Sequence, residues 1–119
     1  MTETVEIIDI SELGFSVADA EDITFSFDGS DLVLEFNDWQ ENHISVKCEN
    51  TLGFKFQNAE YEISDSERYD SSHIVHDSAW VKEHIKQGEA WKNEDWFHYK
   101  LNFNAAGIVE VLCSKLVKT

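Results

Sequence analysis

The chain has 119 residues and a formal net charge of −15, and half of its 24 acidic residues lie within the first 46 positions, which contain no lysine or arginine. A potential of that sign repels nucleic acids and anionic membranes, so we exclude both as partners and expect a basic protein partner. Hydrophobic residues make up 42% of the chain and aromatic residues 13%, which is enough to build a core and is atypical of disordered acidic chains. We therefore expect a single folded domain over residues 1–119.

Two further features bear on the compartment. The sequence has no run of about 18 apolar residues that could form a transmembrane helix, and its start lacks the basic and apolar regions of a signal peptide. Cys48 and Cys113 are far apart and each lies in an alternation of apolar residues, which indicates reduced thiols in the core rather than a disulfide framework. We expect a cytoplasmic protein.

Residues 3–20 hold apolar residues among acids, which fits a strand around residues 5–10, a lid or an irregular wrap, and the first clear hairpin covers residues 23–37. The turn between the hairpin strands is Asp28–Asp31, with the sequence DGSD, in which Gly29 accepts a positive φ. This turn places residue 27 opposite 32, 25 opposite 34 and 23 opposite 36. That register brings six apolar side chains to one face of the sheet: Ile23, Phe25, Phe27, Leu32, Leu34 and Phe36.

Residues 43–57 alternate between polar and apolar without a change of phase. Their apolar members all have even numbers: Ile44, Val46, Cys48, Leu52, Phe54 and Phe56. A two-residue turn at Asn50 and Thr51 would put the two halves out of phase. The pattern therefore predicts either one long bent strand or a hairpin with a three-residue loop at residues 49–51, and we favour the hairpin because Asn50 tolerates the left-handed conformation.

Residues 58–72 are polar and acidic, which predicts a long loop with the character of an edge strand, and a short strand is expected at 73–77. A short helix is predicted over about 78–87, because aromatic and apolar residues recur there at helical spacing. We expect Trp80 and Trp96 to pack this helix against the sheet. The signals for its start and its end are a cap and a glycine stop: Asp77 or Ser78, and Gly88.

The last predicted element is a hairpin over residues 97–113, in which Ala105–Gly107 forms a three-residue loop. This loop pairs Phe103 with Val109, Leu101 with Val111, and Tyr99 with Cys113. The opposite face of the hairpin mixes polar and apolar residues, so we expect the helix to cover part of it. The predicted fold class is α+β and mainly antiparallel β, namely a strongly curved meander sheet or half-barrel built from hairpins with one short helix.

Few residues carry a chemical signal. His73, His76 and Asp77 are of the types that bind zinc or iron, but positions 73 and 76 of a strand point to opposite faces and no third strong ligand is placed by the sequence. The chain contains no G-x-S-x-G motif and no phosphate-binding glycine loop, and both cysteines lie on faces expected to be buried. We therefore expect neither a metal nor another cofactor, and we expect that the protein is not an enzyme.

Two tryptophans lie in polar, acidic connections, where an aromatic side chain is typical of a protein interface or of a cover over the edge of a core. Together with nearby carboxylates they define our candidate partner-binding residues: Glu35, Asp38, Trp39, Glu41, Glu60, Glu62, Glu67 and Trp91.

The segments Leu34–Cys48 (LEFNDWQENHISVKC) and His98–Leu112 (HYKLNFNAAGIVEVL) resemble small acidic bacterial single-domain proteins of uncharacterised function, some of which are similar to toxin-neutralising immunity proteins. The matching motifs are structural, so the resemblance implies a toxin-neutralising role but assigns no functional residue. Our first hypothesis is a non-enzymatic immunity protein that binds a basic, nuclease-type toxin through its acidic surface. The alternatives are a small-molecule-binding domain with a pocket in the curved sheet, and an accessory protein whose acidity keeps it soluble. The sequence does not specify an oligomeric state.

Overall fold

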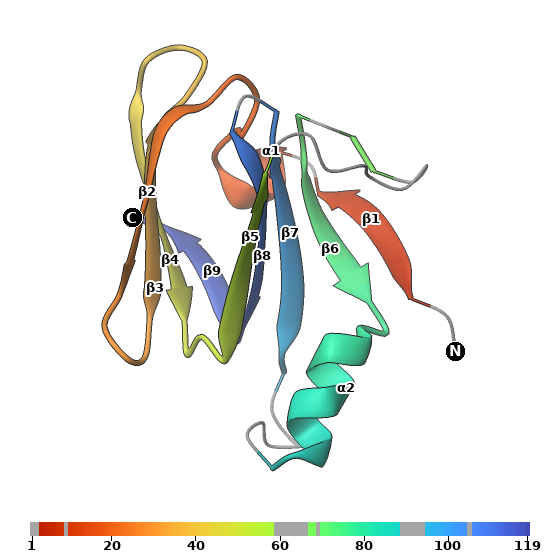
Figure 1. The fold of residues 1–119 in the computed structure, drawn as a ribbon. Coiled ribbons are helices and arrows are strands. Elements are labelled where there is room, and N and C mark those ends of the chain that lie inside the picture. Colours follow the sequence, from red (N-terminus) through yellow and green to blue (C-terminus); the bar gives the residue numbers. More distant parts are fainter. Residues whose placement is uncertain (1–2, 9, 59–66, 69, 89–94, 105) are drawn as a thin grey trace.

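The computed structural model describes residues 3–8, 10–58, 67–68, 70–88, 95–104 and 106–119. Neither helix of this part of the chain has the length and apolar character needed to cross a bilayer. The elements follow one another along the chain as Figure 1 shows: β1 (Thr4–Ile8), α1 (Ile10–Leu13), β2 (Glu21–Phe27), β3 (Leu32–Asn37), β4 (His43–Glu49), β5 (Gly53–Asn58), β6 (Ser72–His76), α2 (Ala79–Lys86), β7 (Phe97–Phe103), β8 (Gly107–Cys113) and β9 (Lys115–Lys118).

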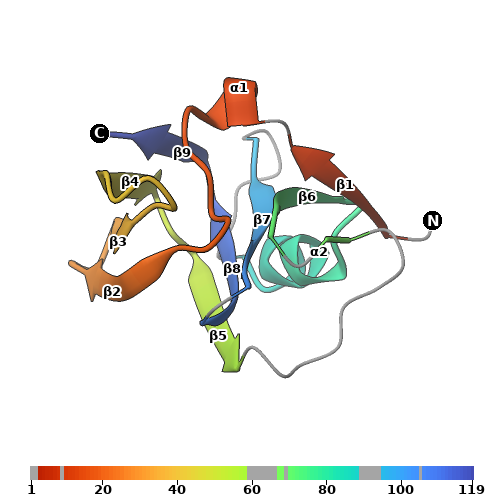
Figure 2. The ribbon, with the colours of Figure 1, turned by 90° about the horizontal axis from the view of Figure 1, so that it is seen from above.

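The described strands form two antiparallel sheets, which lie opposite each other in the view of Figure 2. One sheet has the strand order β1-β6-β7-β8-β5 and the other has the order β2-β3-β4-β9. The prediction of a mainly antiparallel β fold with one short helix is confirmed, with the four-residue α1 as an addition. The single meander sheet is not observed, because the strands divide between two sheets and neither sheet closes into a barrel within the described residues.

The two sheets share a corner at which two chain segments cross together from one sheet to the other. β4 pairs with β9 up to Glu49 and Lys115, and β5 pairs with β8 from Gly53 and Leu112 onward. Backbone hydrogen bonds continue through the corner, where Ser114 N donates to Glu49 O at 2.9 Å. The favoured hairpin between β4 and β5 is therefore wrong. The unbroken phase instead keeps the apolar side chains facing one interior while the strand changes sheet.

The predicted β2–β3 hairpin is present, and Phe27 pairs with Leu32 and Phe25 with Leu34 as expected. The Asp28 carboxylate accepts the backbone N–H groups of Asp31 at 2.7 Å and Ser30 at 2.9 Å, and these bonds hold the pKa of Asp28 below its usual range. The predicted pairing of residue 23 with 36 is wrong. The register shifts between Glu21 and Thr24, where Asp22 has a φ of +56°.

The last hairpin is also present, but its register differs by two residues from the prediction. Phe103 pairs with Gly107, Leu101 with Val109 and Tyr99 with Val111. The chain therefore turns earlier, and Ala106 N donates to Phe103 O at 3.0 Å. Gly107 is the first residue of β8, and glycine fits there because a Cβ atom would lie 2.1 Å from the carbonyl oxygen of Gln57 on β5. A shift of two residues leaves every side chain on its predicted face.

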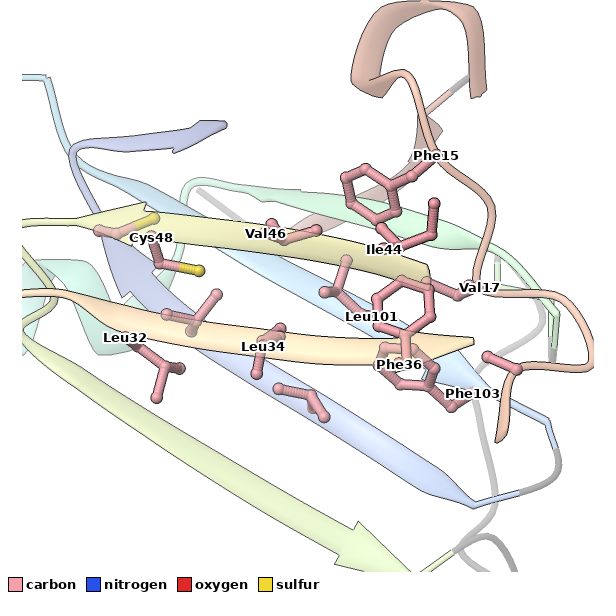
Figure 3. Packing of buried hydrophobic residues seen from close by; sticks show 14 residues of the cluster. Phe15, Val17, Leu32, Leu34, Phe36, Ile44, Val46, Cys48, Leu101 and Phe103 are labelled. Carbon is pink, nitrogen blue, oxygen red and sulfur yellow. The ribbon is translucent and has the colours of Figure 1, made fainter. Parts of the chain in front are cut away.

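The hydrophobic core fills the space between the two sheets, as Figure 3 shows. Phe36 of β3 packs edge-on against Phe103 of β7, with 5.2 Å between ring centroids, and also contacts Phe15 of the segment after α1. Cys48 and Cys113 are both free thiols and fully buried. The neighbouring Cys48 thiol, together with burial, raises the pKa of Cys113 far above its ordinary value. Each fully buried aliphatic or aromatic side chain contributes about 1.5–3 kcal/mol to folding.

The predicted helix is observed as α2. The Ser78 hydroxyl accepts the backbone N–H of Val81 at 3.2 Å, which makes Ser78 the N-cap, and Gly88 follows the helix end with a φ of +80°. Trp80 attaches the helix to the sheet, because its ring lies 5.2 Å from that of His98 on β7 and Nζ of Lys55 on β5 lies 4.1 Å from its centroid.

Candidate partner-binding surface

The turn between β3 and β4 presents Trp39 to solvent. The carboxylate of Asp38 accepts the backbone N–H groups of Gln40 at 3.0 Å and Asn42 at 2.8 Å, and Asp38 N donates to Asn42 O at 2.9 Å. These bonds give the turn a fixed shape. Trp39 at its tip is 57% exposed, which is the largest exposure among the large hydrophobic residues of the described chain.

A hollow of about 430 Å³ adjoins this tryptophan, and five carboxylates line it. The end of the segment before β2 and the start of β2 supply three of them, and the β3–β4 turn supplies the other two. No lysine or arginine is among the lining residues, which are Asp19, Glu21, Asp22, Asn37, Asp38, Trp39 and Glu41. Five like charges around one hollow repel one another, so a cation placed among them lowers the electrostatic energy of the site.

The backbone around this hollow adopts unusual conformations. Asp19, Asp22 and Glu41 have φ values of +50°, +56° and +64°, and they are three of the five non-glycine residues with positive φ in the described structure. Side-chain contacts hold two of them in place. Asp19 and Asn104 of the β7–β8 turn exchange two hydrogen bonds, of 2.8 and 2.7 Å, and Asn37 Nδ2 donates to Asp22 Oδ2 at 3.2 Å. Positive φ values held by such contacts are concentrated at functional sites in many proteins.

The structure separates the remaining predicted partner-binding residues. Glu35 is exposed on β3, two residues before Asn37 and outside the hollow. Glu67 does not lie on the surface, because it is 8% exposed and its carboxylate lies 2.9 Å from Lys100 Nζ and accepts from Asn102 Nδ2. We therefore remove Glu67 from the candidate surface. Three predicted residues lie outside the described part of the chain: Glu60, Glu62 and Trp91.

The two histidines of β6 differ in burial and have different hydrogen-bond partners. His73 is fully buried, its Nε2 accepts Arg68 N–H at 3.0 Å, and burial lowers its pKa. His76 is exposed and its Nε2 lies 2.5 Å from the carboxylate of Glu6 on β1. Within the described residues, no three histidine, cysteine or acidic side chains are grouped so that they could hold a metal ion, and Asp77 joins neither histidine in such a group.

A buried polar relay, which was not predicted from the sequence, lies on the outer face of the larger sheet. Ser78 Oγ lies 2.8 Å from His98 Nδ1, and His98 Nε2 lies 2.8 Å from Glu110 Oε1. The hydrogen bond from His98 holds the pKa of Glu110 below its usual range. A serine, an imidazole and a carboxylate in this order also occur in hydrolytic triads.

The surroundings of the relay indicate a structural role. Ser78 is 5% exposed and its oxygen already accepts the Val81 N–H that caps α2. The first backbone N–H of the helix, that of Ala79, donates to the Glu3 carboxylate at 2.6 Å, so this donor beside Ser78 is already occupied. We interpret the relay as the anchor of α2 on the sheet. The outward phase of His98 and Glu110, beneath a predicted helix, is the sequence signal that could have revealed it.

No model of a protein family, no curated protein and no solved structure matches this chain.

Proposed function

We propose that the protein is a non-enzymatic binding protein that holds a basic protein partner through the acidic hollow and Trp39. The observation that carries the proposal is the exposed Trp39 beside a hollow of about 430 Å³ lined by five carboxylates and by no lysine or arginine. Tryptophan is enriched among the residues that dominate binding energy at interfaces, and the fixed turn lowers the entropy lost when it is buried.

Charge complementarity supports a specific kind of partner. Nucleases expose basic surfaces because they bind phosphates, and an acidic protein that covers such a surface blocks substrate access. The net charge of −15 steers such a partner toward the chain and raises the association rate. The proposed role is that of an immunity protein in the cytoplasm which neutralises a nuclease-type toxin, in line with the resemblance of Leu34–Cys48 and His98–Leu112 to such proteins.

The partner is to be sought in the protein encoded immediately upstream of this chain. Expression of that protein alone should arrest growth of a host, and co-expression of this chain should restore it. Trp39→Ser should weaken the purified complex by about 30-fold or more, which corresponds to about 2 kcal/mol for an interface anchor. About 0.5 M salt should slow association, because screening removes electrostatic steering.

A matched pair of charge reversals tests the location of the surface. Glu41→Lys changes a lining residue of the hollow, whereas Glu83→Lys makes the same change on exposed α2. Only the first should slow association and prevent rescue. Equal effects of the two variants would contradict the assignment of the hollow, and an upstream protein without toxicity would contradict the immunity role.

One observation favours the small-molecule alternative. A hollow of about 470 Å³ lies between β1, α1 and β9, and Tyr99 lines it together with Glu12, Ile74 and Leu116. The strongly curved sheet around a ligand pocket, which was expected from the sequence, stays a prediction. Saturable binding of a small molecule that shifts amide resonances of β1 and β9 would support this function over the first.

A further inference from the structure

Four phenylalanines lie half-exposed where the outermost strands of the two sheets approach each other. Phe25 of β2 contacts Phe56 of β5 with 5.5 Å between ring centroids, and Phe27 contacts Phe54 at 6.0 Å. Their exposures are 39%, 50%, 49% and 41% in that order, and they make up four of the six exposed large hydrophobic residues of the described chain. We call these residues the phenylalanine seam.

The seam lies at the edge of the core, and the core does not cover it completely. Phe25 and Phe27 pair with the fully buried Leu34 and Leu32, so the rings point toward the interior of the sandwich. At their measured exposures the four rings still leave on the order of 350 Å² of aromatic surface in water, taking about 200 Å² for each side chain. The largest apolar patch of a monomeric protein is commonly of this size, and it is often functional.

β2 also offers unpaired backbone groups beside the seam. It stands at the end of its sheet and bonds to β3 alone, just as β5 stands at the end of the other sheet, within the residues that the structure describes. Edge strands are commonly protected by proline, by charged side chains, above all lysine, or by a β-bulge. In β2 the two acids and the register shift lie within the first residues, and Thr24–Phe27 contains no proline, charged side chain or bulge, whereas β5 carries Lys55 in its middle. β2 is therefore the less protected edge and can accept an added strand.

The charges around β2 decide which occupant fits. Glu21 and Asp22 lie at its start and Asp28 follows its last residue, and no lysine or arginine occurs before Lys47. A second copy of the chain would bring the same carboxylates and a further net charge of −15 to this edge, so self-pairing is opposed. An extended segment that carries lysine or arginine meets opposite charge at both ends of the strand.

We propose that the free edge of β2 and the phenylalanine seam bind an extended segment of a cationic protein partner, in which apolar residues alternate with lysine or arginine. The segment adds to β2 by main-chain hydrogen bonds, every second side chain packs on the seam, and the basic side chains lie near Glu21, Asp22 and Asp28. The cationic character of the partner rests on the proposed function, whereas the edge and the seam do not.

The test uses a short synthetic peptide in which lysine alternates with phenylalanine and valine. A control peptide has the same composition with its lysines grouped at one end, so that its charge is equal but its alternation is lost. Binding to the full chain is measured by fluorescence anisotropy and mapped by amide chemical shifts. The alternating peptide should bind at least about tenfold more tightly than the control and should shift the amides of β2 and the seam.

Two kinds of variant locate the site. Phe25→Ser combined with Phe27→Ser should lower the affinity at least about tenfold. This double variant also alters the edge of the core. Ser26→Lys therefore provides a second test, because it adds a positive charge at an exposed position of β2 and leaves the core intact. It should also lower the affinity for the alternating peptide. Gln87→Lys adds the same charge at the exposed end of α2 and should leave peptide binding within about twofold of the unmodified chain.

The outcomes separate this inference from the proposed function. Equal binding of the two peptides, shifts confined to the Trp39 hollow, or unchanged affinity of Ser26→Lys would overturn the strand-addition site while leaving toxin rescue unaffected. Peptide binding at β2 together with failure of rescue would support the site and refute the immunity role. A dimer in sedimentation that Phe25→Ser dissociates would show that a second copy occupies the seam, and would overturn the proposal.

Discussion

Replacing Ser78 by alanine removes one hydroxyl that serves two partners. Its oxygen accepts Val81 N–H at the start of α2, and it lies 2.8 Å from Nδ1 of the buried His98. Loss of an N-cap costs about 1 kcal/mol, and a buried imidazole nitrogen left without a partner costs about 1–3 kcal/mol more. We expect Ser78→Ala to lower the free energy of unfolding by about 2–4 kcal/mol, a large part of the stability of a small domain.

Urea unfolding followed by tryptophan fluorescence measures this change. With a slope of about 2 kcal/mol per molar urea, the midpoint should fall by about 1–2 M. Ser26→Ala, at an exposed position of β2, is the control and should stay within about 0.5 kcal/mol of the unmodified chain. Ser78→Ala and Glu110→Gln should be non-additive, because His98 couples them. A loss below about 0.5 kcal/mol, or covalent labelling of Ser78 by a fluorophosphonate in the folded protein, would refute the interpretation as an anchor.

Three further predictions concern the core. Leu34→Ala, at a position with 0% exposure, should cost about 3–5 kcal/mol in urea unfolding, whereas Val33→Ala on the opposite face of β3 should cost less than half as much. Cys48 and Cys113 should react with a thiol reagent only as fast as the protein unfolds, since both are buried, and fast reaction in the folded state would contradict the packing. Burial raises the pKa of Tyr99 to about 12, so the stabilisation from its neutral form is complete below pH 10 and is lost as the pH rises through about 12. Absorbance at alkaline pH should show one tyrosine that ionises at a higher pH than the tyrosines of the unfolded chain.

The alternation of side chains predicted most strands and the β2–β3 and β7–β8 hairpins, but it did not predict every register or the pairing of strands distant in sequence. Period-two patterns assign each residue to a face, so a register error of two residues in the β7–β8 hairpin cannot be seen in the pattern. In the observed register Gly107 lies where a Cβ atom would be 2.1 Å from the carbonyl oxygen of Gln57, on a strand about fifty residues earlier, and the local pattern holds no information on such a contact. For the same reason residues 43–57 looked like a hairpin, since their pattern holds no information on which sheet each half joins.

Only the part of the candidate surface that lies within one turn was predictable from the sequence. Asp38, Trp39 and Glu41 belong to one turn, and the polar context of that turn indicated exposure. Asp19 and Asp22 join them through the antiparallel pairing of β2 with β3, which brings the start of β2 back to the end of β3. Glu67 was mistaken for a surface acid because its partner Lys100 lies 33 residues away, and composition alone cannot predict such a pair.

The shared corner between the sheets has a consequence for how the domain comes apart. β4 runs directly into β5 and β8 into β9, so each sheet is built partly from chain that belongs to the other. Neither sheet can open by itself without releasing the hydrogen bonds that continue through Glu49 and Ser114. The protein should therefore unfold as one cooperative unit, with the slowest amide protons of both sheets exchanging through the same global opening. A partner that binds only the smaller sheet would then stabilise the whole molecule.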